Sequence, residues 1–216
     1  METQTNNTKK NSIPKWLKVS ILIVGVILII GGLLKILSTS NTFVDKFNEV
    51  QVPNSGIKND LTDIGNILSG TAEKETKKDY TSIISDLQTV LVKLNDIETK
   101  IASTSILLTE FQGKINDSSN QNIKTTGTLF IDVFKSKNVA TLKMVNDTRN
   151  LVNQAIIYYN EIANNQKITI DIKKFIADGK VFAENTQIMT NLSVQYEATA
   201  NDFAKAAGFT IEKNSK

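Results

Sequence analysis

The sequence predicts an all-α protein in which a single N-terminal transmembrane helix precedes an antiparallel bundle of three long helices and one short helix. One uncharged stretch is long enough to cross a bilayer, and an apolar 4-3 repeat runs from Ile83 to Ile115. Only two prolines and ten glycines interrupt the 216 residues, which suits long helices. Apolar residues make up 40% of the chain and aromatic residues 6%, so the expected core is mainly aliphatic.

The predicted transmembrane helix covers residues 16–37, and its centre, residues 19–34, reads VSILIVGVILIIGGLL without a charge. As a helix it would extend about 33 Å, enough for a hydrocarbon core of about 30 Å. The expected membrane-interface residues are Trp16, Lys18 and Lys35, because an indole ring and lysine stems favour the head-group region. A cleaved signal peptide is the alternative, but the apolar length favours an uncleaved anchor.

The basic residues indicate how this anchor is oriented. Up to Lys35 the chain has five lysines against one glutamate, whereas the remainder has 20 basic and 21 acidic residues. By the positive-inside rule, residues 1–15 form a short cytosolic tail, and the chain beyond the anchor lies outside the cytoplasm. The expected location is the cell membrane, with the lipid bilayer as one partner. A nucleic-acid-binding domain would carry its basic residues in the folded part, so nucleic acid is not an expected partner.

The chain after the anchor is expected to start with a juxtamembrane linker at residues 38–56. Pro53 and Gly56 are the reason, since both residues disfavour the interior of a helix. A short helix then follows and ends near Gly70. The predicted bundle spans residues 57–208, and residues 209–216 form a tail that frays.

The strongest pattern predicts a long helix after Thr76, a candidate N-cap whose capping box Asp79 would close. Its 4-3 repeat has one polar position, Thr104, among ten. The helix-packing seam is named from these apolar residues: Ile83, Leu87, Val90, Leu94, Ile97, Ile101, Leu108 and Phe111. Further apolar residues widen the stripe, which favours packing between two neighbours in a bundle. A parallel dimer through the same seam is the alternative.

Two more long helices complete the prediction. Residues 116–122 read as a loop, and the next helix, residues 123–164, has a polar middle. Asn138, Thr141 and Thr148 would fall on or beside its core side, so this helix packs less tightly or faces a partner. The last helix begins near Thr169 or Asp171 and stops at Gly208.

No residue pattern indicates catalysis, a cofactor or a metal site. The chain has neither cysteine nor histidine, and it has no phosphate-binding loop, nucleophile elbow or zinc-protease motif. The paired acids Asp60 and Asp63 are interpreted as part of a solvated helix face. Arg149, the only arginine, is expected to pair with Asp147 or with an acid of a neighbouring helix.

These observations favour a single-pass, membrane-anchored bacterial envelope protein, because the asparagine, isoleucine and lysine bias is typical of AT-rich bacterial genomes. Its helical ectodomain would act as a non-enzymatic interaction or scaffold module, with a protein partner or a homo-oligomer formed by helix packing. The alternative function is a ligand-binding, sensor-like bundle that works through a partner protein, since the short cytosolic tail holds no output domain.

Overall fold

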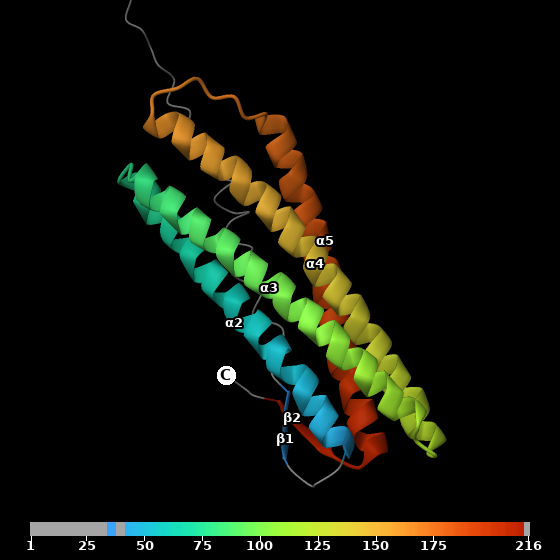
Figure 1. Cartoon of the computed structure of the whole chain (residues 1–216). Helices are drawn as coiled ribbons and strands as arrows, with labels where there is room; N and C mark the ends of the chain where they lie inside the picture. The colour runs from blue at the N-terminus through green and yellow to red at the C-terminus, as the bar shows by residue number, and fades with distance from the viewer. Residues whose placement is uncertain (1–33, 38–41, 214–216) are drawn as a thin grey trace, which may run out of the picture.

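The computed structural model describes residues 34–37 and 42–213. Its elements are β1 (Leu34–Leu37), α2 (Thr42–Thr76), α3 (Tyr80–Asn116), α4 (Gln121–Ala163), α5 (Ile172–Ala207) and β2 (Thr210–Lys213). Short connections make the four helices run alternately up and down, as Figure 1 shows. The predicted all-α helical bundle is confirmed for this part of the chain. It has four long helices, however, instead of three long helices and one short helix.

Helix α2 overturns the predicted linker, because it already begins at Thr42 and continues through Pro53, Gly56 and Gly70. A proline inside a helix costs about 3 kcal/mol, but α2 buries a continuous apolar face on both sides of it. Phe47 and Val50 precede the proline in the core, and further buried residues follow it: Ile57, Leu61, Ile64 and Leu68. Tertiary packing therefore outweighs the local helix-breaking signal.

Gly56 has a packing role inside this helix. A Cβ atom at Gly56 would lie 3.0 Å from Cε and 3.1 Å from Cδ of Lys100 on α3. The missing side chain thus leaves room for the lysine stem, whose ammonium reaches the carboxylate of Asp60 one helical turn further along. Asp60 is buried, so the prediction that it belongs to a solvated face is wrong.

The remaining helix ends follow local capping chemistry. Helix α3 starts one turn later than predicted: Asp79 is its N-cap and accepts a hydrogen bond from the Ser82 N–H, whereas Thr76 ends α2. Asn120 caps α4 and Asp171 caps α5, in agreement with the predicted loop and the predicted start near Asp171. Gly208 ends α5 with φ of 80°, a left-handed conformation that glycine adopts without a Cβ penalty.

Strands β1 and β2 differ from what was predicted for the end of the anchor and for the C-terminal tail. They pair antiparallel, with Leu34 opposite Lys213 and Leu37 opposite Thr210, below α2 in Figure 1. The last four residues of the predicted anchor, Leu34–Leu37, are therefore a strand, and the tail predicted to fray is paired through residue 213. The buried Phe209 also holds this tail, because its ring packs on those of Phe47 and Phe203.

The core is divided along the bundle axis. The basal cluster lies at the end near the strands and is rich in aromatic rings, with these buried residues: Val44, Phe47, Val50, Leu108, Phe111, Ile115, Ile123, Phe130, Ile131, Phe134, Tyr196, Ala200, Phe203, Ala204, Ala207 and Phe209. The distal cluster fills the other end and is mainly aliphatic, with these buried residues: Ile57, Leu61, Ile64, Leu68, Ile83, Leu87, Val90, Leu94, Ile97, Ile101, Met144, Val145, Val152, Ala155, Tyr159 and Phe182. Between them lies a buried polar layer formed by Gln51, Asn54, Lys137, Asn138, Thr141 and Tyr196.

Candidate interaction surface

The predicted helix-packing seam lies entirely inside the bundle. Its eight residues have exposed fractions of at most 2%, and they are Ile83, Leu87, Val90, Leu94, Ile97, Ile101, Leu108 and Phe111. Thr104, the polar position, is also buried, and its hydroxyl donates to the Lys100 carbonyl at 2.8 Å. Because the chain's own helices cover the seam, a parallel dimer through it is excluded in the folded bundle. A partner would have to use another face.

The predicted membrane-interface residues are only partly within the described structure. Trp16 and Lys18 lie outside it, and Lys35 belongs to β1, where it stands opposite Glu212. Within residues 34–37 and 42–213, no helix is long and apolar enough to cross a membrane.

The outward side of α3 is unusually poor in charge. Thirteen residues between positions 81 and 109 are exposed, and Asp96 is the only charged one. Over their whole lengths α3 and α5 each expose seventeen residues; three of those on α3 are charged, Asp96, Glu110 and Lys114, against six on α5. Protein surfaces need charged groups to stay soluble and separate, so a long helix side without them is typical of a contact surface.

Helix α4 continues this uncharged region on the neighbouring side. Its exposed residues from position 146 onward carry no charge: Asn146, Asn150, Asn153, Ile157, Asn160 and Ala163. Large aliphatic side chains stand out of both helices: Val92 and Ile106 on α3 are 60% and 64% exposed, and Val139, Ile157 and Leu129 on α4 are 68%, 49% and 52% exposed. Val139 precedes the uncharged stretch of α4, and the exposed Lys143 lies between them. We call the region of both helices that contains Val92, Ile106, Val139 and Ile157 the α3–α4 outer face.

The four aliphatic side chains of this face are arranged in two pairs. Arg149 on α4 contacts Glu98 and Asn95 on α3, which fixes the level at which the antiparallel helices meet. Counted from there, Ile106 and Val139 lie at the same level towards the basal end, about 12–16 Å away. Val92 and Ile157 lie together, within about one turn, towards the distal end.

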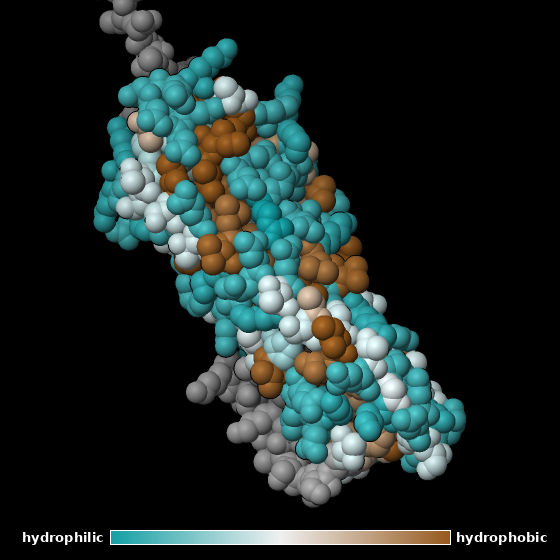
Figure 2. All heavy atoms as spheres, viewed as in Figure 1, coloured by the Kyte–Doolittle hydropathy of each residue, from teal (hydrophilic) through white to brown (hydrophobic). Residues whose placement is uncertain are grey.

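Figure 2 shows the surface on which these pairs lie. Hydrophobic side chains follow the line of α3 and α4, and polar groups interrupt them near the middle. Half-buried apolar residues packed against the distal cluster extend the region inward along the two helices: Ile84, Leu91, Leu142 and Ile156. The outer face is therefore continuous with the core beneath it.

Arg149 links the two helices at the centre of this face. Its guanidinium donates to both carboxylate oxygens of Glu98, at 2.8 and 2.7 Å, and to the side-chain oxygens of Asn146 and Asn95, at 2.9 and 3.1 Å. The hydrogen bond from Arg149 lowers the pKa of Glu98. The expected pairing with an acid of a neighbouring helix is thus observed, and the bidentate geometry holds α3 and α4 in register.

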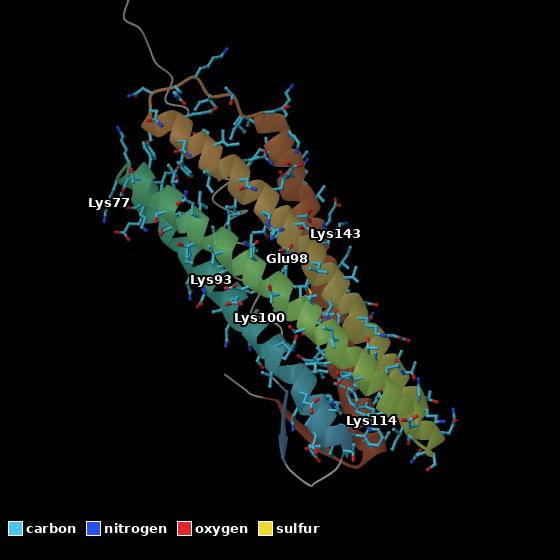
Figure 3. All side chains as sticks on the ribbon, in the orientation of Figure 1. Lys77, Lys93, Glu98, Lys100, Lys114 and Lys143 are labelled. Atoms are coloured by element: carbon cyan, nitrogen blue, oxygen red, sulfur yellow. The ribbon has the colours of Figure 1, made fainter. Side chains whose placement is uncertain are left out.

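Apart from the central Arg149–Glu98 pair, several charged side chains lie near this region. In Figure 3, Lys93 and Lys100 follow the α2 side of α3, Lys143 lies on α4, and Glu98 stands between the two helices. Lys93 bridges Asp63 at 2.6 Å and Asp60 at 3.8 Å. Lys93 and Lys100 are thus paired with Asp60 and Asp63 across the α2–α3 contact.

The buried polar layer is the second chemically distinctive region, and Lys137 is its centre. Its ammonium donates to the Asn54 side-chain oxygen at 3.2 Å and lies 4.6 Å from the centre of the Tyr196 ring. Desolvation lowers the pKa of Lys137 to about 8, although Glu197 opposes this shift and Lys58 adds to it. The Asn54 amide in turn donates to Gln51, so that the layer connects α2, α4 and α5.

Sequence reasoning identified only part of this layer. Asn138 and Thr141 were expected on or beside the core side, and both are buried, as is Thr148. Lys137 was missed, although its spacing after Phe130 and Phe134 continues the 4-3 repeat and places it at a core position. The α3–α4 outer face was also missed, because a search for apolar repeats passes over a surface defined mainly by the lack of charge.

The acidic side chains of the described residues do not form a metal site. Asp60 and Asp63 are engaged by lysines, and within the described ranges no three acidic side chains converge on a common point. A cavity of about 10 Å³, room for one water molecule, lies in the distal half. The chain matches no protein-family model, no curated protein and no solved structure.

Proposed function

We propose that this chain is a membrane-tethered envelope protein whose four-helix bundle is a protein interaction module, with the α3–α4 outer face as its contact surface. The observation that carries the proposal is this face: one charge among the thirteen exposed residues at positions 81–109 of α3, with four exposed aliphatic side chains on α3 and α4. Contact surfaces are depleted of charge at their centre and enriched in arginine. The face has few exposed charges and has Arg149 at its middle, and its exposed aliphatic side chains add apolar area that a partner can bury.

The shape of the bundle supports a scaffold role. Helix α3 alone would extend about 55 Å, and its seam packs against α2 and α4 throughout. Arg149 and Glu98 hold α3 and α4 in fixed register. The outer face is therefore a rigid surface, which binds without the entropy loss of ordering a loop.

The proposed tether rests on the sequence before β1. Residues 16–33 carry Lys18 as their only charge and would extend about 27 Å as a helix, close to the hydrocarbon thickness of a bilayer. The anchor proposed here ends four residues earlier than the 16–37 segment, because Leu34–Leu37 pair with β2. Lysines on the N-terminal side favour a cytoplasmic N-terminus and an external bundle.

Membrane topology is tested with the full chain carrying an epitope after Lys216, expressed in a bacterial host. Protease added to intact spheroplasts should remove the epitope, and alkaline extraction should leave the chain in the membrane fraction. An N-terminal epitope should be cut only after lysis. A C-terminal epitope that resists protease in intact spheroplasts would show that the bundle is not external.

The contact surface is tested by in-cell crosslinking of the full chain with the substitutions Ile106→Lys and Val139→Lys. Both should abolish the crosslinked complexes, because a charge buried inside the contact surface must be desolvated without a partner. Val52→Lys is the matched control, since Val52 is 72% exposed but lies on α2. Complexes that survive both face substitutions would exclude this surface.

A further inference from the structure

We infer that the partner of the α3–α4 outer face is a second copy of this chain, bound side by side and parallel about a twofold axis that follows the line between α3 and α4. This inference rests on the proposed function, because it names the partner of the same surface. Three properties of the face favour a second copy: the levels of its apolar residues, its low net charge and its area.

The levels of the apolar residues make the face complementary to itself. A twofold axis parallel to the helices places α3 of one copy opposite α4 of the other without changing the level. Ile106 then faces Val139 of the second copy, and Val139 faces the Ile106 of that copy. The same rotation brings Val92 opposite Ile157. Each of these apolar side chains therefore contacts another apolar side chain across the interface. This is possible because the two residues of each pair, one on α3 and one on α4, lie at about the same height along the bundle axis.

The low net charge also suits contact with an identical surface. When a face meets its own copy, a net charge on it meets the same charge, and the two repel each other. The exposed residues at 81–109 of α3 include one charge, Asp96, and the exposed α4 residues from Val139 onward include one, Lys143, of the opposite sign; Arg149 and Glu98 neutralise each other within one chain. A face adapted to a charged partner would instead carry an excess of the opposite sign.

The area of the face is sufficient for a stable dimer. Residues 81–109 of α3 extend about 42 Å, and two adjacent helices present a width of about 20 Å. The product is about 800 Å² for each copy, which is the usual contribution of one partner to a specific interface.

The proposed tether selects the parallel arrangement. Two copies anchored in one membrane point the same way. An antiparallel pair about an axis across Thr99 would also join apolar residues, with Val92 facing Ile106 of the other copy. The two arrangements therefore differ in which residues meet, and cysteine pairs distinguish them directly.

The chain has no cysteine, so introduced cysteines can only crosslink with one another. Two full-length chains with different epitopes are expressed together, one with Ile106→Cys and the other with Val139→Cys, and the membranes are oxidised. A disulfide carrying both epitopes is expected, because the two Cα atoms should lie within the roughly 7 Å that a disulfide spans. Ile106→Cys in both chains should crosslink poorly, since the two copies of this residue lie on opposite sides of the axis.

The mixed pair Val92→Cys with Ile106→Cys reports the antiparallel arrangement, and Val52→Cys with Ile106→Cys measures random collision. A predominant Val92–Ile106 disulfide, or an Ile106–Val139 disulfide no stronger than the Val52 background, would overturn the inference. An independent measurement is the mass of the detergent-solubilised full chain. It should correspond to two copies of 23.9 kDa and fall to one copy with Ile106→Lys.

Failure of this inference can be separated from failure of the proposed function. If no mixed disulfide forms and the solubilised chain is a monomer, the second copy is excluded. If Ile106→Lys still abolishes crosslinked complexes in cells under those conditions, the face binds a different protein and the proposed function stands. If the substitution changes neither result, both proposals fail.

Discussion

The two ends of the bundle are stabilised by different kinds of core. In the basal cluster, Phe130 alone packs against five other aromatic rings, and all four helices and the C-terminal tail contribute residues. In the distal cluster most residues are aliphatic and come from α2, α3 and α4, and Phe182 is the only buried residue of α5. The basal end therefore interlocks all four helices, whereas the distal end is mainly a three-helix core.

Along the distal end α5 buries two aromatic side chains, Phe175 and Phe182, and polar contacts with α4 make up much of the rest. Asp178 accepts hydrogen bonds from Asn150 and Gln154 of α4 and pairs with Lys174 within α5. These contacts reach solvent, and such contacts contribute less than buried apolar area. The comparison teaches that stability is concentrated at the end nearest the proposed membrane, while the distal end of α5 is the part most easily released.

The largest expected effect is the loss of stability when the basal cluster is disrupted. Phe130→Ala should lower the free energy of unfolding by about 3–5 kcal/mol, because it removes a fully buried ring from the centre of the aromatic cluster. The matched control is Phe182→Ala, which removes the same side chain from the distal cluster and should cost less. Urea unfolding of the two variants measures the difference. An equal or larger loss for Phe182→Ala would show that the two ends are equally stabilised.

The next largest effect on stability is expected in the buried polar layer between the two clusters. Lys137→Met should raise the free energy of unfolding at pH 7 by about 2 kcal/mol, since removing a buried ammonium outweighs one lost hydrogen bond to Asn54 of about 1 kcal/mol. Lys143→Met, an exposed lysine of the same helix, should have little effect. A destabilised Lys137→Met variant would show that the layer contributes to stability.

The pH dependence of the unmodified chain tests the same layer. Because the folded-state pKa of Lys137 is lowered to about 8 and the unfolded value is 10.5, the unfolded chain binds more protons between these values. Stability should therefore rise as pH increases from 8 towards 10. Above pH 10 the buried Tyr196, whose pKa burial raises, acts in the opposite direction. The rise should disappear in Lys137→Met, and its persistence there would exclude Lys137 as the cause.

A smaller effect is expected at the distal start of α5. Asp171 accepts hydrogen bonds from the N–H groups of Lys173 and Lys174, so Asp171→Ala should cost about 1 kcal/mol. Hydrogen exchange should accelerate in the first turns of α5 and remain slow around Phe203. Asp202→Ala, near the other end of α5, serves as the control. Uniform acceleration along α5 would mean that the helix opens as one unit.

The smallest expected effect lies on the outer face. A double-mutant cycle of Glu98→Gln and Arg149→Lys should give a coupling of at most about 1 kcal/mol, because water screens a pair that is about one-third exposed. The lowered pKa of Glu98 means that this contribution is present above pH 4.5 and is lost as the pH falls below it. The exposed pair Glu73–Lys77 is the control and should couple more weakly. A stronger coupling at Glu73 would contradict the role of Arg149 as the link between α3 and α4.

Local sequence signals predicted most helix ends but not the length of α2. Asp171 and Gly208 act through neighbouring backbone groups, so their effect can be inferred from the adjacent residues alone. Pro53 also acts locally, but burial of the α2 face against other helices opposes it, and that burial depends on residues far away in the chain. The β1–β2 pair could not be predicted for the same reason, since it joins residues more than 170 positions apart.

The sequence by itself determined the helical periodicity and the buried side of α3, because a 4-3 repeat of aliphatic residues has one side to bury whichever neighbours cover it. Tertiary structure decided which side chains of the other helices cover that buried side. It placed Lys137 against Tyr196 and carried α2 through Pro53. It also brought the uncharged sides of α3 and α4 together as one face. The physical reason is that burial and surface charge are properties of several helices assembled together, and no single segment determines them.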